Sequence, residues 1–301
     1  MTRRSLLVAP IWPALAQTAD PPSPTIRVDV RLIRVLANVK DPSNQLVGGL
    51  NKDDFQLFDN GVEQEIAVFE RSTSQALRVA VLLDISASVA KDLRYETDAA
   101  IHFARALVAE GNPDDSIALI TFNHAVDLVA GFTRRIQRLE HAMRDVRTGS
   151  GTALYDAVYL AGEELEGREG RKVIICVSDG GDTVSYQKFN GAMLAAQRAQ
   201  AAVYGILVLP VKADAGRNTG GEHALQLMGE RTGGRVLFPS SYEQLTHSFD
   251  EILRDLRTQY LLAYYPKNVA KSKNQFHKLE VKVRNSALRV SARTGYYEDT
   301  L

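Results

Sequence analysis

The stretch Val79-Ala80-Val81-Leu82-Leu83-Asp84-Ile85-Ser86-Ala87-Ser88 decides the fold of this 301-residue chain. Its first five residues form an apolar run that is typical of a buried strand. Asp84, Ser86 and Ser88 then place one carboxylate and two hydroxyls at alternate positions on the loop that leaves the strand. Such hard oxygen ligands suit Mg²⁺, Mn²⁺ or Ca²⁺ rather than zinc or copper. The stretch therefore predicts part of a divalent-cation site, and with it a metal-dependent binding module rather than an obvious enzyme.

Apolar runs and helical patterns alternate from residue 77 to residue 257. The predicted strands cover residues 78–83, 116–122, 126–128, 172–177, 203–208 and 235–238. The predicted helices cover residues 91–110, 134–146, 152–165, 186–201, 224–232 and 242–257. Strands that are separated by helices indicate a mostly parallel sheet with helices on both faces. We therefore expect a three-layer, doubly wound, Rossmann-like α/β domain over 77–257, with the short strand at 126–128 as an antiparallel edge.

An N-terminal β segment, residues 26–72, precedes this region. The apolar residues of 28–39 change phase once, which suggests a bulge in one long strand. A hairpin is predicted to join 55–58 to 66–69 through Asn60-Gly61, because this dipeptide readily adopts the positive φ angles of a tight turn. These strands are too few to be stable alone.

A C-terminal β segment, residues 258–297, follows the α/β region. It contains a strand at 260–265 and alternating patterns at 279–283 and 288–292 that predict a second hairpin with one buried face. Each β segment leaves an apolar face uncovered. We therefore expect both segments to pack together into one small flanking β-domain, with the α/β domain inserted into it. Two separate β appendages are the alternative.

The first residues have the pattern of a cleaved signal peptide. A basic head at Arg3-Arg4 precedes a mostly apolar stretch at 5–15 and a small-x-small pattern at Ala14-Leu15-Ala16. This predicts a signal peptide over 1–16 and a proline-rich linker over 17–25, and the alternative is an irregular N-terminus. No later apolar run approaches the roughly 18 residues of a membrane span. We expect a secreted or periplasmic protein with no transmembrane segment in the mature chain.

Composition narrows the function classes. Lys and Arg together number 36, as do Asp and Glu, so the charge balance gives no reason to expect a nucleic-acid partner. Cys176 is the one cysteine; it falls in a predicted central strand, where a small core residue is expected, and it allows no internal disulfide. The six histidines show no zinc spacing, and no phosphate loop or nucleophile elbow is present. These features favour a protein that is not an enzyme.

Two later loops carry further oxygen ligands. The glycine-rich loop Gly149-Ser150-Gly151-Thr152-Ala153-Leu154-Tyr155-Asp156 opens a predicted helix, and Ser178-Asp179-Gly180-Gly181-Asp182 follows a predicted strand. Ligands bind such sheets at the carboxyl ends of the strands, where the strand order reverses. Thr152 and Asp179 can therefore join Asp84, and two carboxylates with three hydroxyls would leave a bound cation electrophilic.

The order DISAS, GTALYDA, SDGGD resembles a von Willebrand factor type A domain with its metal-ion-dependent adhesion site. The resemblance covers about 77–257. It implies that Mg²⁺, or alternatively Mn²⁺ or Ca²⁺, is held by five residues, some of them through water. In this sequence they are Asp84, Ser86, Ser88, Thr152 and Asp179. The flanking motifs, among them KDDF and DNG before the domain and YLLAYYP after it, resemble a group of type A-related proteins from acidobacteria.

Several residues of these loops have alternative roles. Ser150 is an alternative to Thr152 as the ligand of the second loop. Asp182 is a candidate residue next to the metal ligands, although we favour the interpretation that it caps the helix predicted from Tyr186. Asp156 is expected to bind loop backbone rather than metal. Asp84 and Asp179 would be helix caps if no metal site existed.

The favoured function is cell adhesion-type protein binding through a divalent cation. The partner would present an Asp or Glu whose carboxylate completes the metal coordination. One alternative is a structural component of an envelope or secretion assembly, in which the cation only holds the loops together. Another is a hydrolase that activates water with the metal, for which the sequence offers no convincing general base.

Overall fold

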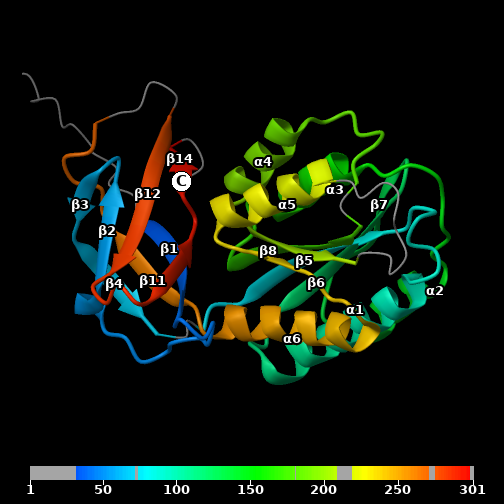
Figure 1. Ribbon diagram of the computed structural model, residues 1–301, viewed down its shortest axis with the longest axis horizontal. Helices are drawn as coiled ribbons and strands as arrows, with labels where there is room; N and C mark the ends of the chain where they lie inside the picture. Colours follow the sequence, from blue (N-terminus) through cyan, green and yellow to red (C-terminus); the bar gives the residue numbers. More distant parts are fainter. Residues whose placement is uncertain (1–31, 72–73, 180, 209–218, 271–274, 299–301) are drawn as a thin grey trace, which may run out of the picture. The chain divides into compact units, whose positions relative to one another are not determined.

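A mixed sheet of six strands forms the centre of the α/β domain (Figure 1). The computed structural model describes residues 32–71, 74–179, 181–208, 219–270 and 275–298. The sheet contains β5 (Leu77–Asp84), β6 (Ser116–Phe122), β7 (Val126–Thr133), β8 (Arg171–Ser178), β9 (Ala202–Leu207) and β10 (Val236–Leu237). Their order is β10-β9-β8-β5-β6-β7, and only β7, at one edge, runs antiparallel to its neighbour. The mostly parallel sheet and its antiparallel edge are confirmed.

Helices cover both faces of this sheet (Figure 1). One face carries α1 (Leu93–Glu110), α2 (Ile136–Arg144) and α6 (Tyr242–Arg257), and the other carries α3 (Leu154–Leu165), α4 (Phe189–Arg198) and α5 (Thr219–Thr232). The apolar run of β5 serves both layers, because successive side chains of a strand point to opposite faces. Val79 and Val81 belong to the first core, whereas Ala80 and Leu82 belong to the second. The three-layer, doubly wound architecture is therefore confirmed.

Two antiparallel sheets are built from the strands that flank the α/β domain. Their orders are β13-β1-β11-β4 and β14-β12-β2-β3. The strands before the α/β domain are β1 (Ile33–Lys40), β2 (Phe55–Asp59), β3 (Val62–Gln64) and β4 (Ile66–Glu70), with a short 3₁₀ helix at Lys52–Asp54. The strands after it are β11 (Tyr260–Tyr264), β12 (Phe276–Val283), β13 (Arg289–Ala292) and β14 (Gly295–Tyr297). We call these eight strands the β-unit.

The β-unit joins the two ends of the described chain. β1 pairs with both β11 and β13, and β2 pairs with β12. Ile33 and Leu57 share one apolar cluster with Leu262 and Leu279, so N-terminal and C-terminal strands bury a common core. The expected packing of the two β segments against each other is confirmed. The strand expected at 28–39 is described only from residue 32, so its predicted phase change lies partly outside the described residues.

The predicted partner in the first hairpin is wrong. Asn60 and Gly61 do have positive φ angles, of 48° and 81°. The strand that returns from this turn is β3, however, whereas β4 pairs with β11 in the other sheet. Gln64 lies at the end of β3, where the chain changes sheet. Its buried side-chain amide donates to the C=O of Lys267 and accepts from the N–H of Lys267.

The predicted second hairpin is also wrong. The turn at Asn285 exists, and the Asn285 side chain accepts a 3.1 Å hydrogen bond from the N–H of Ala287. Nevertheless β12 pairs with β2 and β14, whereas β13 pairs with β1. The turn therefore carries the chain from one sheet to the other. Each of these two strands has one buried face. This pattern is compatible with a hairpin, and it is equally compatible with two strands in opposite sheets of a common core.

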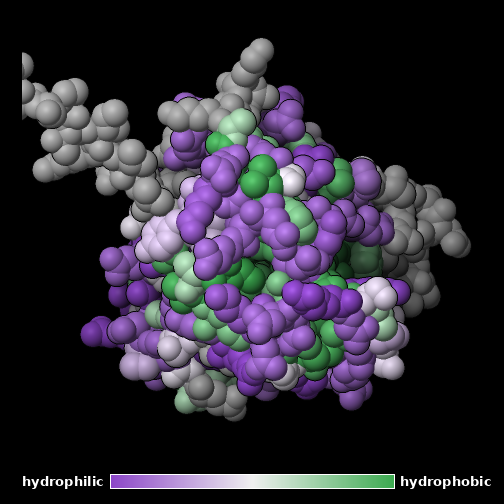
Figure 2. Space-filling view, turned by 90° about the vertical axis from the view of Figure 1, so that its left-hand side faces the viewer, coloured by the Kyte–Doolittle hydropathy of each residue, from purple (hydrophilic) through white to green (hydrophobic). Residues whose placement is uncertain are grey.

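Polar residues cover much of the outer face of the β-unit, with smaller hydrophobic areas between them (Figure 2). This agrees with the alternation along β12, in which His277 and Leu279 are buried and Lys278 and Glu280 are exposed. Among the described helices, none combines the length and hydrophobicity that a membrane crossing requires.

Candidate metal centre

The candidate site lies at the topological switch point of the six-stranded sheet. β5 has β6 on one side and β8 on the other, and all three run parallel. Their carboxyl ends therefore meet at the same sheet edge, which is where sheets of this type bind ligands. Asp84 is the last residue of β5, and Ser178 is the last residue of β8.

The Asp84 carboxylate is completely buried and held by two hydrogen bonds. Its Oδ1 accepts from the N–H of Ser86 at 2.8 Å, and its Oδ2 accepts from the hydroxyl of Ser178 at 2.6 Å. Burial raises the pKa of the Asp84 carboxyl above its usual range, although both serine contacts oppose the shift. A buried carboxylate with a fixed orientation is a suitable ligand for a hard cation.

The two serines of the first loop lie together. The hydroxyl oxygens of Ser86 and Ser88 are 2.9 Å apart. Ser86 is buried, but Ser88 is exposed, so the loop presents one hydroxyl inward and one toward solvent. The backbone N–H of Ile85 donates to the carbonyl of Phe122 at 2.8 Å, which anchors the loop to the end of β6.

The glycine-rich loop is bound to the first loop through backbone contacts. Gly149 forms a parallel bridge with Ser86, and its N–H donates to the carbonyl of Ile85 at 2.9 Å. A side chain at position 149 would meet the side-chain amide of Asn123, which would have to shift to make room. Thr152, three residues later, is buried.

The third loop is bound to both of the others. The N–H of Thr152 donates to the hydroxyl of Thr183 at 2.9 Å, and the N–H of Thr183 donates to the carbonyl of Thr152 at 2.8 Å. The bond between Ser178 and Asp84 connects the third loop to the first. Asp179, half-buried, accepts a 3.3 Å hydrogen bond from the N–H of Gly181. All three predicted loops are thus tied to one another in pairs.

The remaining predicted residues take separate places on these loops. Ser150 is exposed. Asp182 accepts hydrogen bonds from the N–H of Tyr155 at 3.2 Å and from the hydroxyl of Ser185 at 2.5 Å. It therefore caps α3 rather than the segment that follows it, which corrects the expected helix. Asp156 accepts from the backbone N–H groups of Tyr186 and Gln187, as expected.

Sequence reasoning missed two polar residues at this edge of the sheet. One is Ser178, whose contact with Asp84 joins residues 94 positions apart and has no local signal. The other is Glu96, in the first turn of α1, which is completely buried. Burial raises the pKa of the Glu96 carboxyl to about 9, and the negative charges of Asp84, Asp92 and Asp179 add to this shift. The sequence signal that could have identified Glu96 is its position as an acid on the apolar stripe of this helix.

The donor set is dominated by hydroxyls rather than by charged ligands. Within the described residues, no group of three or more His, Cys, Asp or Glu side chains is placed to hold a metal ion. The predicted set contains only two carboxylates, Asp84 and Asp179, beside three hydroxyls. Such a set fits a hard cation that keeps bound water, and it does not fit zinc.

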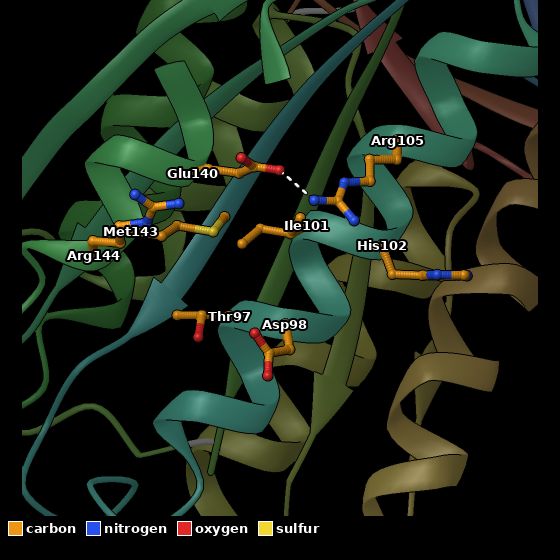
Figure 3. A pocket seen from close by; sticks show the side chains of 8 residues that line it. All are labelled: Thr97, Asp98, Ile101, His102, Arg105, Glu140, Met143 and Arg144. Carbon is orange, nitrogen blue, oxygen red and sulfur yellow. Dashed lines mark hydrogen bonds and ion pairs between the residues drawn. The ribbon is translucent and has the colours of Figure 1, made fainter. Parts of the chain in front are cut away.

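A groove between α1 and α2 is a separate feature (Figure 3). Its volume is about 470 Å³, and the guanidinium of Arg105 lies 2.5 Å from the carboxylate of Glu140 across it. Asp98 and His102 also line this groove, but none of the predicted metal ligands does. The groove is therefore distinct from the candidate metal centre.

Comparison with known proteins supports the class that this fold indicates. Residues 79–181 match the family model of the von Willebrand factor type A domain. The matched stretch runs from β5 to the loop after β8, and it includes Asp84, Thr152 and Asp179. No curated protein matches the sequence.

Solved structures resemble the chain in fold. The vWF domain of the type V pili tip protein Mfa5 from Porphyromonas gingivalis is 13% identical, with a TM-score of 0.50 over 60% of this chain and 95% of that one. The pilus adhesin SpaC from Lactobacillus rhamnosus GG, in an open conformation, is 8% identical, with a TM-score of 0.50 over 80% and 47%. Proximal thread matrix protein 1 from the mussel byssus is 17% identical, with a TM-score of 0.51 over 66% and 50%.

Proposed function

We propose that this protein is a divalent-cation-dependent protein-binding module of the adhesion type. In this proposal Asp84, Ser86, Ser88, Thr152 and Asp179 hold Mg²⁺, with Mn²⁺ or Ca²⁺ as substitutes. A partner's Asp or Glu completes the coordination. The observation that carries the proposal is the buried, fixed carboxylate of Asp84 at the switch point, on a loop that is bound to the two other ligand-bearing loops.

The bound cation would act as a Lewis acid that attracts the partner's carboxylate. The chain's own residues would orient it: Asp84 from the end of β5, Ser86 from the buried side, and Ser88 from the exposed side. Two carboxylates would balance the charge of a divalent cation without exceeding it. The exposed side of the site would then retain affinity for an additional negative ligand.

A purely structural cation is the alternative, in a component of an envelope or secretion assembly. The loops already hold one another through backbone hydrogen bonds, such as those of Gly149 with Ile85 and of Thr183 with Thr152. They do not depend on a metal for these contacts. This favours a cation that serves a ligand over a cation that only fastens the loops. Catalysis is the weaker alternative, because His124, the histidine beside the Gly151 loop, is exposed to solvent.

The test uses the mature chain and two probes. Isothermal titration with Mg²⁺ is expected to show binding to the wild type and none to Asp84→Ala, while Asp127→Ala, which removes an exposed carboxylate on β7, binds as the wild type does. Peptides that each present one Asp or Glu are then compared with their Asn or Gln counterparts. The acidic peptides should bind only with Mg²⁺ present. Binding that survives both EDTA and Asp84→Ala would refute the proposal.

The structural alternative predicts a different result. Mg²⁺ would then raise the melting temperature, but no acidic peptide would bind in a Mg²⁺-dependent way.

We further propose a secreted or periplasmic location, on the basis of the signal pattern at 1–16, which lies outside the described residues. Mass measurement of the N-terminus of the exported protein should show cleavage after Ala16. The proposed location would be contradicted if the protein were found only in the cytoplasm, with residues 1–16 still attached. The grouping with the type A-related proteins of acidobacteria stays a prediction from the sequence.

A further inference from the structure

Glu96 is a buried carboxylate without any hydrogen-bond partner in the described residues. None of its surface is exposed, and neither side-chain oxygen is bonded. Other buried acids are satisfied: Asp59 accepts from two tyrosines, Asp115 accepts from the N–H of Leu77, and Asp255 pairs with Arg235. A buried polar group without a hydrogen-bond partner destabilises the fold, and a buried unpaired charge does so more strongly. Glu96 therefore lacks a partner that the other buried acids have.

The surroundings of Glu96 indicate what kind of partner is missing. The charged groups that act on it are Asp84, Asp92 and Asp179, and all of them are acidic. Two of these, Asp84 and Asp179, are the carboxylates of the proposed cation site. A positive charge beside them would stabilise Glu96 as well, because opposite charges at short range favour the ionised form. A divalent cation in the proposed site would supply that charge.

We infer that Glu96 is a further residue of the cation site, which it reaches from the buried side, through a cation-bound water. This inference rests on the proposed function of the site. Contact through water agrees with the finding that, within the described residues, no three acidic side chains are placed to hold an ion directly. It also agrees with the tendency of Mg²⁺ to keep several of its waters. The exposed side, where Ser88 lies, stays open to a partner.

A third carboxylate changes the charge balance of the site. Asp84 and Asp179 together neutralise a divalent cation, and Glu96 adds one more negative charge. The cation should therefore stay bound when no partner is present. Without a cation, burial and the neighbouring charges of Asp84 and Asp179 disfavour the ionised form of Glu96. Glu96 thus stabilises the cation-bound state and destabilises the cation-free state.

The test replaces Glu96 with the neutral residue of nearly the same shape. For Glu96→Gln, we expect the Kd for Mg²⁺ to rise by about tenfold or more, as for other residues that hold metal-bound groups. The melting temperature in EDTA should rise or stay unchanged, because the replaced carboxyl has no hydrogen-bond partner in the cation-free protein. Asp98→Asn is the matched control, since Asp98 is an exposed acid of α1 that lines the groove of Figure 3. Its Kd should stay within about twofold of the wild-type value.

A second variant separates charge from shape. Glu96→Asp keeps the charge and should retain a lower Kd than Glu96→Gln. The inference would be overturned if both variants raised the Kd for Mg²⁺ equally, or if Glu96→Gln left the Kd unchanged. If the wild type binds no Mg²⁺ at all, the proposed function fails as well. If the wild type binds, Asp84→Ala does not, and Glu96→Gln equals the wild type, only the role of Glu96 is refuted.

Discussion

The hydroxyl of Ser178 donates a 2.6 Å hydrogen bond to the Oδ2 of Asp84, and this bond joins the last residues of two neighbouring parallel strands. Asp84 is the central residue of the proposed cation site. Because contacts with Ser86 and Ser178 orient its carboxylate, a cation would not have to order it. The bond thus connects the packing of the sheet directly to the proposed site.

Ser178→Ala tests this relationship. The variant removes a hydrogen bond to a charged, buried group, which is worth about 1.5–3 kcal/mol. We expect the free energy of unfolding in EDTA to fall by about that amount, and the Kd for Mg²⁺ to rise about tenfold because Asp84 can rotate. Urea unfolding and calorimetric titration measure the two effects. Ser116→Ala, on the neighbouring strand β6, is the control, and a Ser178→Ala Kd equal to its Kd would contradict the prediction.

Gly149→Ala should displace the glycine-rich loop. The added methyl group would meet the side chain of Asn123, which is itself held by a 2.9 Å hydrogen bond from the N–H of Ala125. Overpacking of this kind costs about 1–3 kcal/mol. We expect weaker Mg²⁺ binding together with a lower melting temperature. Gly131→Ala, where an added methyl group would meet open space, should change neither, and equal behaviour of the two variants would count against the close approach.

Asp59→Asn should destabilise the β-unit. The Asp59 carboxylate is fully buried; it accepts from the hydroxyl of Tyr264 at 2.6 Å and of Tyr296 at 2.9 Å, and lies 2.9 Å from the Nδ1 of His277. Burial and the bond to Asp59 raise the pKa of Tyr264, so this hydroxyl stays a donor. Breaking a buried charged network by changing one partner costs roughly 3–5 kcal/mol.

Chemical denaturation measures this loss in the free energy of unfolding. Glu63→Gln is the control, because Glu63 is an exposed acid on β3 of the same hairpin. Its effect should stay within about 0.5 kcal/mol, as for ordinary surface substitutions. A loss of similar size in both variants would show that the buried network does not stabilise the β-unit.

Because of Tyr242, we expect the stability of the start of α6 to depend on pH. Its hydroxyl donates to the Oδ1 of Asp92 at 2.5 Å, and its ring stacks on that of Tyr95. The hydrogen bond to Asp92, and then burial, raise the pKa of Tyr242 to about 12. An unfolded tyrosine titrates near pH 10, so the contact is complete below about pH 10 and is lost as the pH rises toward 12.

The stability difference between the wild type and Tyr242→Phe should therefore shrink across this range. Urea unfolding at several pH values measures it, and absorbance of tyrosinate follows the titration itself. Tyr186→Phe is the control, since Tyr186 is 93% exposed. A difference that does not change between pH 8 and the alkaline limit would contradict the role of this hydroxyl.

The α/β domain could be predicted almost completely because its signals are local. Each strand of the six-stranded sheet begins and ends within about one residue of its expected position, except that β7 continues to Thr133. Apolar runs such as the one in β5 can only be buried when helices cover both faces. The order of the three loops then follows from the parallel sheet, and it brings Asp84 and Thr152 to the same edge.

The β-unit could be predicted only in part. Alternation along a strand shows which side chains are buried, but it does not show which sheet the strand joins. The pattern therefore predicts that β4 and β13 pair with the neighbouring strand in sequence, although each lies in one sheet with a strand from the other end of the chain. Ser178 and Glu96 escaped notice for a similar reason. The role of Ser178 depends on its contact with Asp84, which is distant in sequence. The role of Glu96 depends on the proposed cation, which a sequence does not show.

The pairing of β4 with β11 has a mechanical consequence. Leu261 pairs with Glu70, so the chain leaves the β-unit and returns to it at adjacent strands. A pulling force applied between β1 and β14 is carried by the strand pairs of the β-unit and does not pass through the α/β sheet. A force applied to the α/β domain instead pulls on both connections at once. The three loops at the edge of the α/β sheet can therefore keep their shape while the β-unit is under tension.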